Sequence, residues 1–173
     1  MMEKAPDLDA GSPAYAAGVE IDISVDGAGW DQAPFSAEAL ARRAALAVLS
    51  SAAADIGPCE LSIVLSDDET VRDLNRTWRG KDSPTNVLAF PAGAARVVGQ
   101  PALLGDVIVA FGVASDEAGD GSLSDHIAHL VVHGTLHLLG YDHQDDDEAE
   151  EMETLETRIL AGMGVDDPYA DHG

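Results

Sequence analysis

The chain has 173 residues, 46% of them hydrophobic, which is enough to bury the core of one ordinary domain and excludes wholesale disorder. Its 32 acidic and 9 basic residues give a formal net charge of −23, which argues against nonspecific attraction to nucleic-acid phosphates. The single cysteine excludes an intrachain disulfide, and no apolar stretch approaches the roughly 20 residues that span a bilayer. We therefore expect a cytoplasmic protein with no part in the membrane.

The ends of the chain differ in composition from its middle. Residues 1–17 are rich in Asp, Pro, Gly, Ala and Ser, which predicts a flexible N-terminal tail. One domain is expected over residues 18–165, followed by a short C-terminal tail over residues 166–173.

The first predicted elements are a strand, a helix and a second strand. Apolar and polar residues alternate over residues 19–25, as in a half-buried strand. Ser36 can cap an alanine-rich helix over residues 37–54, and residues 60–65 alternate again. This order is typical of a sheet with a crossover helix.

The next helix begins at a capping box formed by residues 66–69, with Ser66 as the cap. It is expected to run to about Trp78, with Val71, Leu74 and Trp78 facing the core. A short apolar strand follows over residues 87–90.

The second half of the chain predicts one more strand and three helices. Residues 106–111 are nearly all apolar, as in a strand buried on both faces. Helices are expected over residues 113–118, 123–139 and 145–162. The whole pattern predicts an α/β (α+β) domain in which about five helices pack on a mixed four-stranded sheet.

The helix predicted over residues 123–139 is apolar nearly all round, so it should be the central, buried helix. At about 100° per residue, one sector of it carries a row of histidines. These are His126, His129, His133 and His137.

The C-terminal end of this helix carries the pattern His-x-x-x-His-x-x-Gly-x-x-His, formed by His133, His137, Gly140 and His143. Histidines four residues apart share one helix face, and a glycine can end the helix and turn the chain back. Three converging imidazoles with an open fourth position are typical of a catalytic zinc site. We therefore predict that His133, His137 and His143 bind one Zn²⁺.

The same spacing occurs in the metzincin peptidases, whose motif begins His-Glu. Here Gly134 stands in the place of the glutamate that serves as general base. Without that carboxylate a metallopeptidase lacks its proton acceptor, so the sequence disfavours peptidase activity.

Four of the nine basic residues lie within ten positions: Arg72, Arg76, Arg79 and Lys81. They could form a local basic patch on an acidic protein, or they could be ordinary solvated charges on a helix surface. Composition alone leaves these two interpretations equally open.

Together these segments resemble the YbeY family of bacterial rRNA maturation endoribonucleases. The histidine motif over residues 133–143 carries the resemblance most specifically. Residues 74–79 (Leu-Asn-Arg-Thr-Trp-Arg), 84–91 (Pro-Thr-Asn-Val-Leu-Ala-Phe-Pro) and 104–109 (Leu-Gly-Asp-Val-Ile-Val) resemble further blocks of that family. Residues 146–150 resemble the acidic run that follows its last histidine.

The resemblance implies a single-strand-specific, metal-dependent endoribonuclease acting in 16S rRNA 3′ end maturation and ribosome quality control. It implies zinc on the three motif histidines, with His133 and Arg79 as catalytic residues. It also implies a small-subunit ribosomal protein and a ribosome-assembly GTPase as partners. Arg72, Arg76 and Lys81 are candidate RNA contacts.

Two other functions stay open on the residues alone. One is a zinc metallopeptidase, and the other is a non-catalytic assembly factor in which zinc mainly ties helices together. Asp142, beside the last motif histidine, could support a metal ligand or simply cap the turn.

Overall fold

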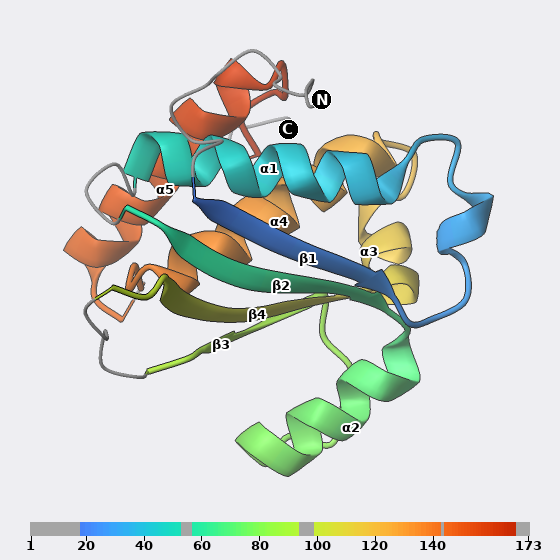
Figure 1. Ribbon diagram of the computed structural model, residues 1–173. Coiled ribbons are helices and arrows are strands. Elements are labelled where there is room, and N and C mark those ends of the chain that lie inside the picture. Colours follow the sequence, from blue (N-terminus) through green and yellow to red (C-terminus); the bar gives the residue numbers. More distant parts are fainter. Residues whose placement is uncertain (1–17, 53–56, 94–98, 143, 169–173) are drawn as a thin grey trace, which may run out of the picture.

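The computed structural model describes residues 18–52, 57–93, 99–142 and 144–168, and Figure 1 shows how their elements are arranged. No helix among these residues is long and apolar enough to cross a membrane. His143 and the proposed N-terminal tail lie outside the described residues, so the predictions made for them, and the domain limits, stay predictions.

Among the described residues, four strands form one mixed sheet in the order β1-β2-β4-β3. They are β1 (Val19–Val25), β2 (Cys59–Ser66), β3 (Val87–Pro91) and β4 (Ala102–Ala110). The first three strands in this order are parallel, whereas the edge strand β3 runs antiparallel to β4. The predicted mixed sheet is therefore confirmed, although β4 begins earlier than the strand predicted at 106–111.

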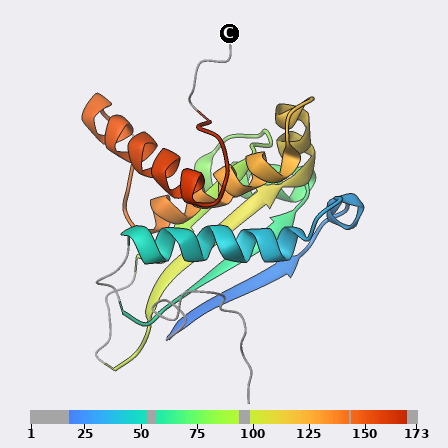
Figure 2. The ribbon, with the colours of Figure 1, turned by 90° about the horizontal axis from the view of Figure 1, so that it is seen from above.

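In the described part of the chain five α-helices pack around the sheet, as predicted. They are α1 (Ala37–Ala52), α2 (Asp68–Arg79), α3 (Phe111–Ala118), α4 (Leu123–Leu138) and α5 (Asp146–Gly162), and a short helix, η3 (Trp30–Gln32), precedes α1. Figures 1 and 2 show α1 and α4 on one face of the sheet, with α5 on the outside of them. On the other face the sheet is covered by α2.

The main core lies between the sheet and α1 and α4. Ile127, Val131 and Leu136 of α4 are fully buried there, as are Val107 and Val109 of β4. This confirms that α4 is the central buried helix. Because α4 cannot shift without opening this core, its polar side chains are held in fixed positions.

A second, smaller core on the opposite face holds α2 against the sheet. It consists of Val71, Leu88, Ile108 and Ala110. With Ile108 on this side and its neighbours on the other, β4 is buried on both faces, as its apolar sequence predicted.

The prediction that Trp78 faces the core is wrong. Its side chain is 70% exposed, whereas the buried positions of α2 are Val71 and Asn75. These two lie four residues apart, and the same stripe continues to Arg79 rather than to Trp78. The arginine, not the tryptophan, is thereby turned toward the edge of the sheet.

The helix cap predicted at Ser66 is displaced by one residue. Ser66 ends β2 and is fully buried, whereas the carboxylate of Asp67 accepts a 2.8 Å hydrogen bond from the backbone N–H of Thr70. This bond lowers the pKa of the Asp67 carboxyl. An ionised cap at the helix N-terminus is favoured by the helix dipole.

Candidate metal centre

A cavity of about 650 Å³ lies along the edge strand β3, between that strand and the C-terminal half of α4. Its lining residues come from α2, β3, α4 and the turn after α4. They are Arg79, Asn86, Val87, Ala89, Pro91, His129, Leu130, His133, Gly134, His137, Gly140, Tyr141 and Asp142. The structure thus brings Arg79 and the first two histidines of the motif to the same cavity.

The motif histidines of α4 converge as their spacing predicted. Nε2 of His133 and Nε2 of His137 are 3.1 Å apart, and the two rings lie 79° from coplanar. Gly140 ends the helix with φ of +101°, and the Tyr141 N–H bonds back to the carbonyl of Leu136. This reversal after the helix is the geometry predicted for the segment that leads to His143.

The spacing of these two nitrogen atoms fits a shared metal ion. Two ligands at about 2.0–2.1 Å from a tetrahedral zinc lie about 3.3 Å from each other. The separation of 3.1 Å between Nε2 of His133 and Nε2 of His137 is close to that value. The donor set therefore suits zinc, because two imidazole nitrogens already lie at the spacing of two ligands on one ion.

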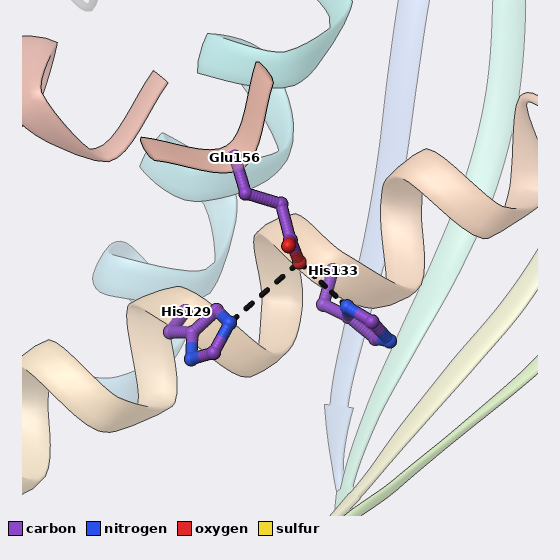
Figure 3. Close-up of side chains that lie close together, drawn as sticks. All are labelled: His129, His133 and Glu156. Carbon is purple, nitrogen blue, oxygen red and sulfur yellow. Dashed lines mark hydrogen bonds and ion pairs between the residues drawn. The ribbon is translucent and has the colours of Figure 1, made fainter. Parts of the chain in front are cut away.

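A buried carboxylate that the sequence did not single out stands behind His133. Glu156 of α5 is 0% exposed, and its Oε2 lies 2.5 Å from Nδ1 of His133 and 3.6 Å from Nε2 of His129 (Figure 3). These three residues could themselves hold a metal ion. One signal for Glu156 was available in the sequence, since it sits on the apolar stripe of its helix between Met152 and Leu160.

Gly134 occupies the closest approach between α4 and the sheet. A Cβ atom at this position would lie 2.8 Å from Cγ1 of Val107 and 3.4 Å from Cγ2 of Val87. A side chain at this position would require Val107, or the helix and strand that meet here, to shift. The packing therefore disfavours the peptidase glutamate at this position.

Arg79 closes the side of the cavity opposite α4. Its Nη2 donates a 3.1 Å hydrogen bond to the carbonyl of Ala89 on the edge strand, and its guanidinium carbon lies 5.7 Å from the Phe90 ring centroid. Both contacts restrain a side chain that would otherwise be mobile. A guanidinium has five N–H donors, so others can face an anion in the cavity.

The remaining basic residues of the cluster are not in the cavity lining. Arg72 pairs with Asp82 at 2.8 Å, and Arg76 pairs with Asp73 at 3.1 Å. The hydrogen bond from Arg72 lowers the pKa of Asp82 and raises that of Arg72 itself. Arg72 and Arg76 are therefore largely neutralised by acidic neighbours, which favours the interpretation as ordinary surface charges for these two, and Lys81 beside them is exposed.

Two further polar residues of the cavity extend the site. Asn86 donates from its amide to Glu117 at 3.0 Å, and Glu117 also contacts the ring of His126 at 2.8 Å. Asp142 lines the cavity after the turn, and its two possible roles, support of a metal ligand and capping of the turn, both stay open.

Comparisons with known proteins place the chain in a family. The family described as "Endoribonuclease YbeY" matches residues 30–164. Proteins with this name from Paramagnetospirillum magneticum and Azorhizobium caulinodans are 53% identical over 159 residues and 55% identical over 157 residues. Each match covers 88% of this chain and 97% of the relative. A third, from Rhodopseudomonas palustris, is 44% identical over 169 residues, which is 95% of this chain and 88% of the relative.

A solved structure shares the fold. The solution structure of TM1509 from Thermotoga maritima matches with a TM-score of 0.51 and 23% identity, over 87% of this chain and 99% of that one. At this identity the likeness shows the common fold alone.

Proposed function

The chain belongs to the YbeY family, and on this premise we propose that it is a metal-dependent endoribonuclease that cleaves single-stranded RNA. Its substrate is the 16S rRNA precursor, whose 3′ end it matures, and it takes part in ribosome quality control in the cytoplasm. The observation that carries this proposal is the cavity in which His133 and His137 converge while Arg79 stands on the other wall.

The metal in this proposal is one Zn²⁺ held by His133, His137 and His143. The proposal is supported by the 3.1 Å approach of the two nitrogens and by the reversal of the chain at Gly140. When bound, zinc would supply a Lewis acid that polarises a phosphate oxygen and makes water more acidic.

Arg79 holds the scissile phosphate against this centre. The transition state of phosphoryl transfer carries negative charge spread over its oxygens, which a fixed guanidinium can stabilise through two parallel hydrogen bonds. Its anchoring to the Ala89 carbonyl supports this role, because a donor that is already oriented need not be ordered during the reaction.

Binding of the RNA strand rests on few cations. Arg72, Arg76 and Lys81 guide the backbone toward the cavity, which requires the first two to exchange their acidic partners for phosphate. Since the whole chain carries −23 and few cations contact phosphate, RNA binding should be weak and should fall only modestly with salt. A small-subunit ribosomal protein and a ribosome-assembly GTPase would compensate by delivering the substrate.

The test is cleavage of a labelled oligoribonucleotide that spans the 3′ end of the 16S precursor, in single-stranded and duplex form, by the zinc-loaded protein. We expect cleavage of the single strand only, lost in His137→Ala and in Arg79→Ala but retained in Arg43→Ala. Arg43 is a matched control because it is an exposed arginine on α1, away from the cavity. Cleavage that survives in His137→Ala would indicate a contaminating nuclease and overturn the proposal.

The same preparations separate the rival functions. Cleavage of casein instead of RNA would establish a peptidase, which the packing at Gly134 disfavours. Binding of assembly intermediates without any RNA cleavage would establish a non-catalytic assembly factor.

A further inference from the structure

Glu156 is a carboxylate in a place where side chains are normally apolar. It lies on the stripe of α5 that packs inward, between the fully buried Met152 and Leu160, and it is itself 0% exposed. Burial of a carboxylate is unfavourable unless it is paired. If α5 needed only to pack on α4, an apolar residue at this position would do so better.

The partner of this carboxylate is the motif histidine of the neighbouring helix. Figure 3 shows Glu156 reaching from α5 to His133. It contacts Nδ1 of the ring, whereas His137 lies near the other ring nitrogen, Nε2. Oε2 lies 2.5 Å from Nδ1 of His133, a distance typical of a short, charge-assisted hydrogen bond. Two ligand atoms on one tetrahedral zinc would lie about 3.3 Å apart, so the 2.5 Å separation fits a hydrogen bond better than a shared ion.

The hydrogen bond fixes which nitrogen of His133 carries the proton. A carboxylate can only accept, so Nδ1 of His133 is the donor and Nε2 carries the lone pair that can bind a metal. That Nε2 is the atom 3.1 Å from Nε2 of His137. The ring is therefore oriented and in the correct tautomer before any metal arrives.

We propose that Glu156 is the positioning residue of the metal centre, which holds His133 in its metal-binding tautomer through a charge-assisted hydrogen bond. This rests on the proposed ligand set of His133, His137 and His143. His129, 3.6 Å from the same oxygen, is a neighbour of the carboxylate and not a ligand. Removing a carboxylate behind a metal-bound histidine typically weakens metal affinity 10- to 100-fold.

The experiment measures zinc affinity by chelator competition and the visible spectrum of the Co²⁺-loaded protein. Glu156→Gln, which keeps the size of the side chain but loses its charge, should weaken zinc binding 10- to 100-fold and alter the Co²⁺ spectrum. Leu160→Ala is the matched control. It leaves a void in the same helix stripe, so it should lower the unfolding temperature of the metal-free protein without changing zinc affinity.

Two further variants separate positioning from ligation. His129→Ala should leave zinc affinity within a few-fold of wild type, whereas His137→Ala should abolish specific binding. Loss of binding in His129→Ala with retention in His137→Ala would assign the ion to His129, His133 and Glu156 and overturn the inference. Unchanged zinc affinity in Glu156→Gln would also overturn the positioning role. A wild-type protein that binds no zinc would instead overturn the proposed ligand set on which that role rests.

A measurement on the wild-type protein covers the case in which Glu156→Gln fails to fold. Nitrogen NMR of the histidine side chains in the metal-free protein should show the proton of His133 on Nδ1. A proton on Nε2 of His133 would refute the positioning role directly.

Discussion

Replacing Gly134 by alanine should destabilise the protein, although alanine is the better helix former. In an exposed helix this change stabilises by about 1 kcal/mol. Here the new methyl group would lie 2.8 Å from Cγ1 and 3.3 Å from Cγ2 of Val107. Because Val107 is fully buried and β-branched, it cannot rotate away.

The net effect follows from two opposing terms. Overpacking of a tight core costs about 1–3 kcal/mol, and the helix propensity returns about 1 kcal/mol of it. We therefore expect Gly134→Ala to lower the free energy of unfolding by about 1 kcal/mol, or the unfolding temperature by about 2–4 °C. The displaced helix also carries His133 and His137, so zinc affinity should fall as well.

The assay is urea unfolding of the metal-free protein, completed as a double-mutant cycle with Val107→Ala. Val107→Ala alone should destabilise by about 2 kcal/mol because it leaves a void. In the double variant the methyl group introduced at position 134 partly fills that void, so the two changes should be less harmful together than their sum by about 1–2 kcal/mol. Stabilisation by Gly134→Ala alone, or simple additivity, would refute the close packing of α4 on β4.

Three other predictions follow from single contacts. Asp67→Ala should destabilise by about 1 kcal/mol at neutral pH, and Asp67→Asn by less. The hydrogen bond from the Thr70 N–H lowers the pKa of Asp67 in the folded protein. The stabilisation by this cap is therefore full above the pKa of Asp67 in the unfolded chain and is lost as pH falls through its pKa in the folded protein. In unfolding curves the effect of Asp67→Ala should shrink below about pH 4, and an effect that does not change with pH would contradict the prediction. Arg79→Lys should reduce kcat for RNA about 100-fold with unchanged zinc affinity, since an ammonium cannot bind phosphate in bidentate fashion; wild-type kcat would refute the role of the guanidinium. Asp82→Asn should tighten RNA binding at low salt by releasing Arg72, and weaker binding in a filter assay would argue that Arg72 makes no contact.

Local sequence patterns predicted most of the fold. The alternation over residues 19–25 gave β1 with its observed limits, and the continuous apolar run gave a strand buried on both faces. The all-apolar helix was predicted as central because a helix without a polar face has nowhere else to pack. In each case the spacing of the apolar residues shows both the type of element and which of its faces must be buried.

Tertiary contacts decided what the patterns could not. Helical spacing places Trp78 on one face with Val71 and Leu74, yet the stripe that faces the sheet continues from Asn75 to Arg79. Ser66 and Asp67 are both good caps, and only the end of β2 determines which of them begins the helix.

In the candidate site, too, local spacing predicted some contacts and tertiary packing decided the others. The spacing of His133 and His137 predicted their convergence, because that spacing alone places both on one helix face. Glu156 comes from another helix, 23 residues further along, and its contact with His133 depends on how α5 packs on α4. A lone carboxylate on an apolar stripe is the pattern that would have pointed to it.

The ligand set is tested most directly by a crystal of the zinc-loaded protein, with diffraction measured on both sides of the zinc absorption edge. The account predicts one anomalous peak about 2.0–2.1 Å from Nε2 of both His133 and His137, with His143 as the third ligand and Glu156 still bonded to Nδ1 of His133. A peak on the Nδ1 side of His133, coordinated by Glu156 and His129, would contradict it.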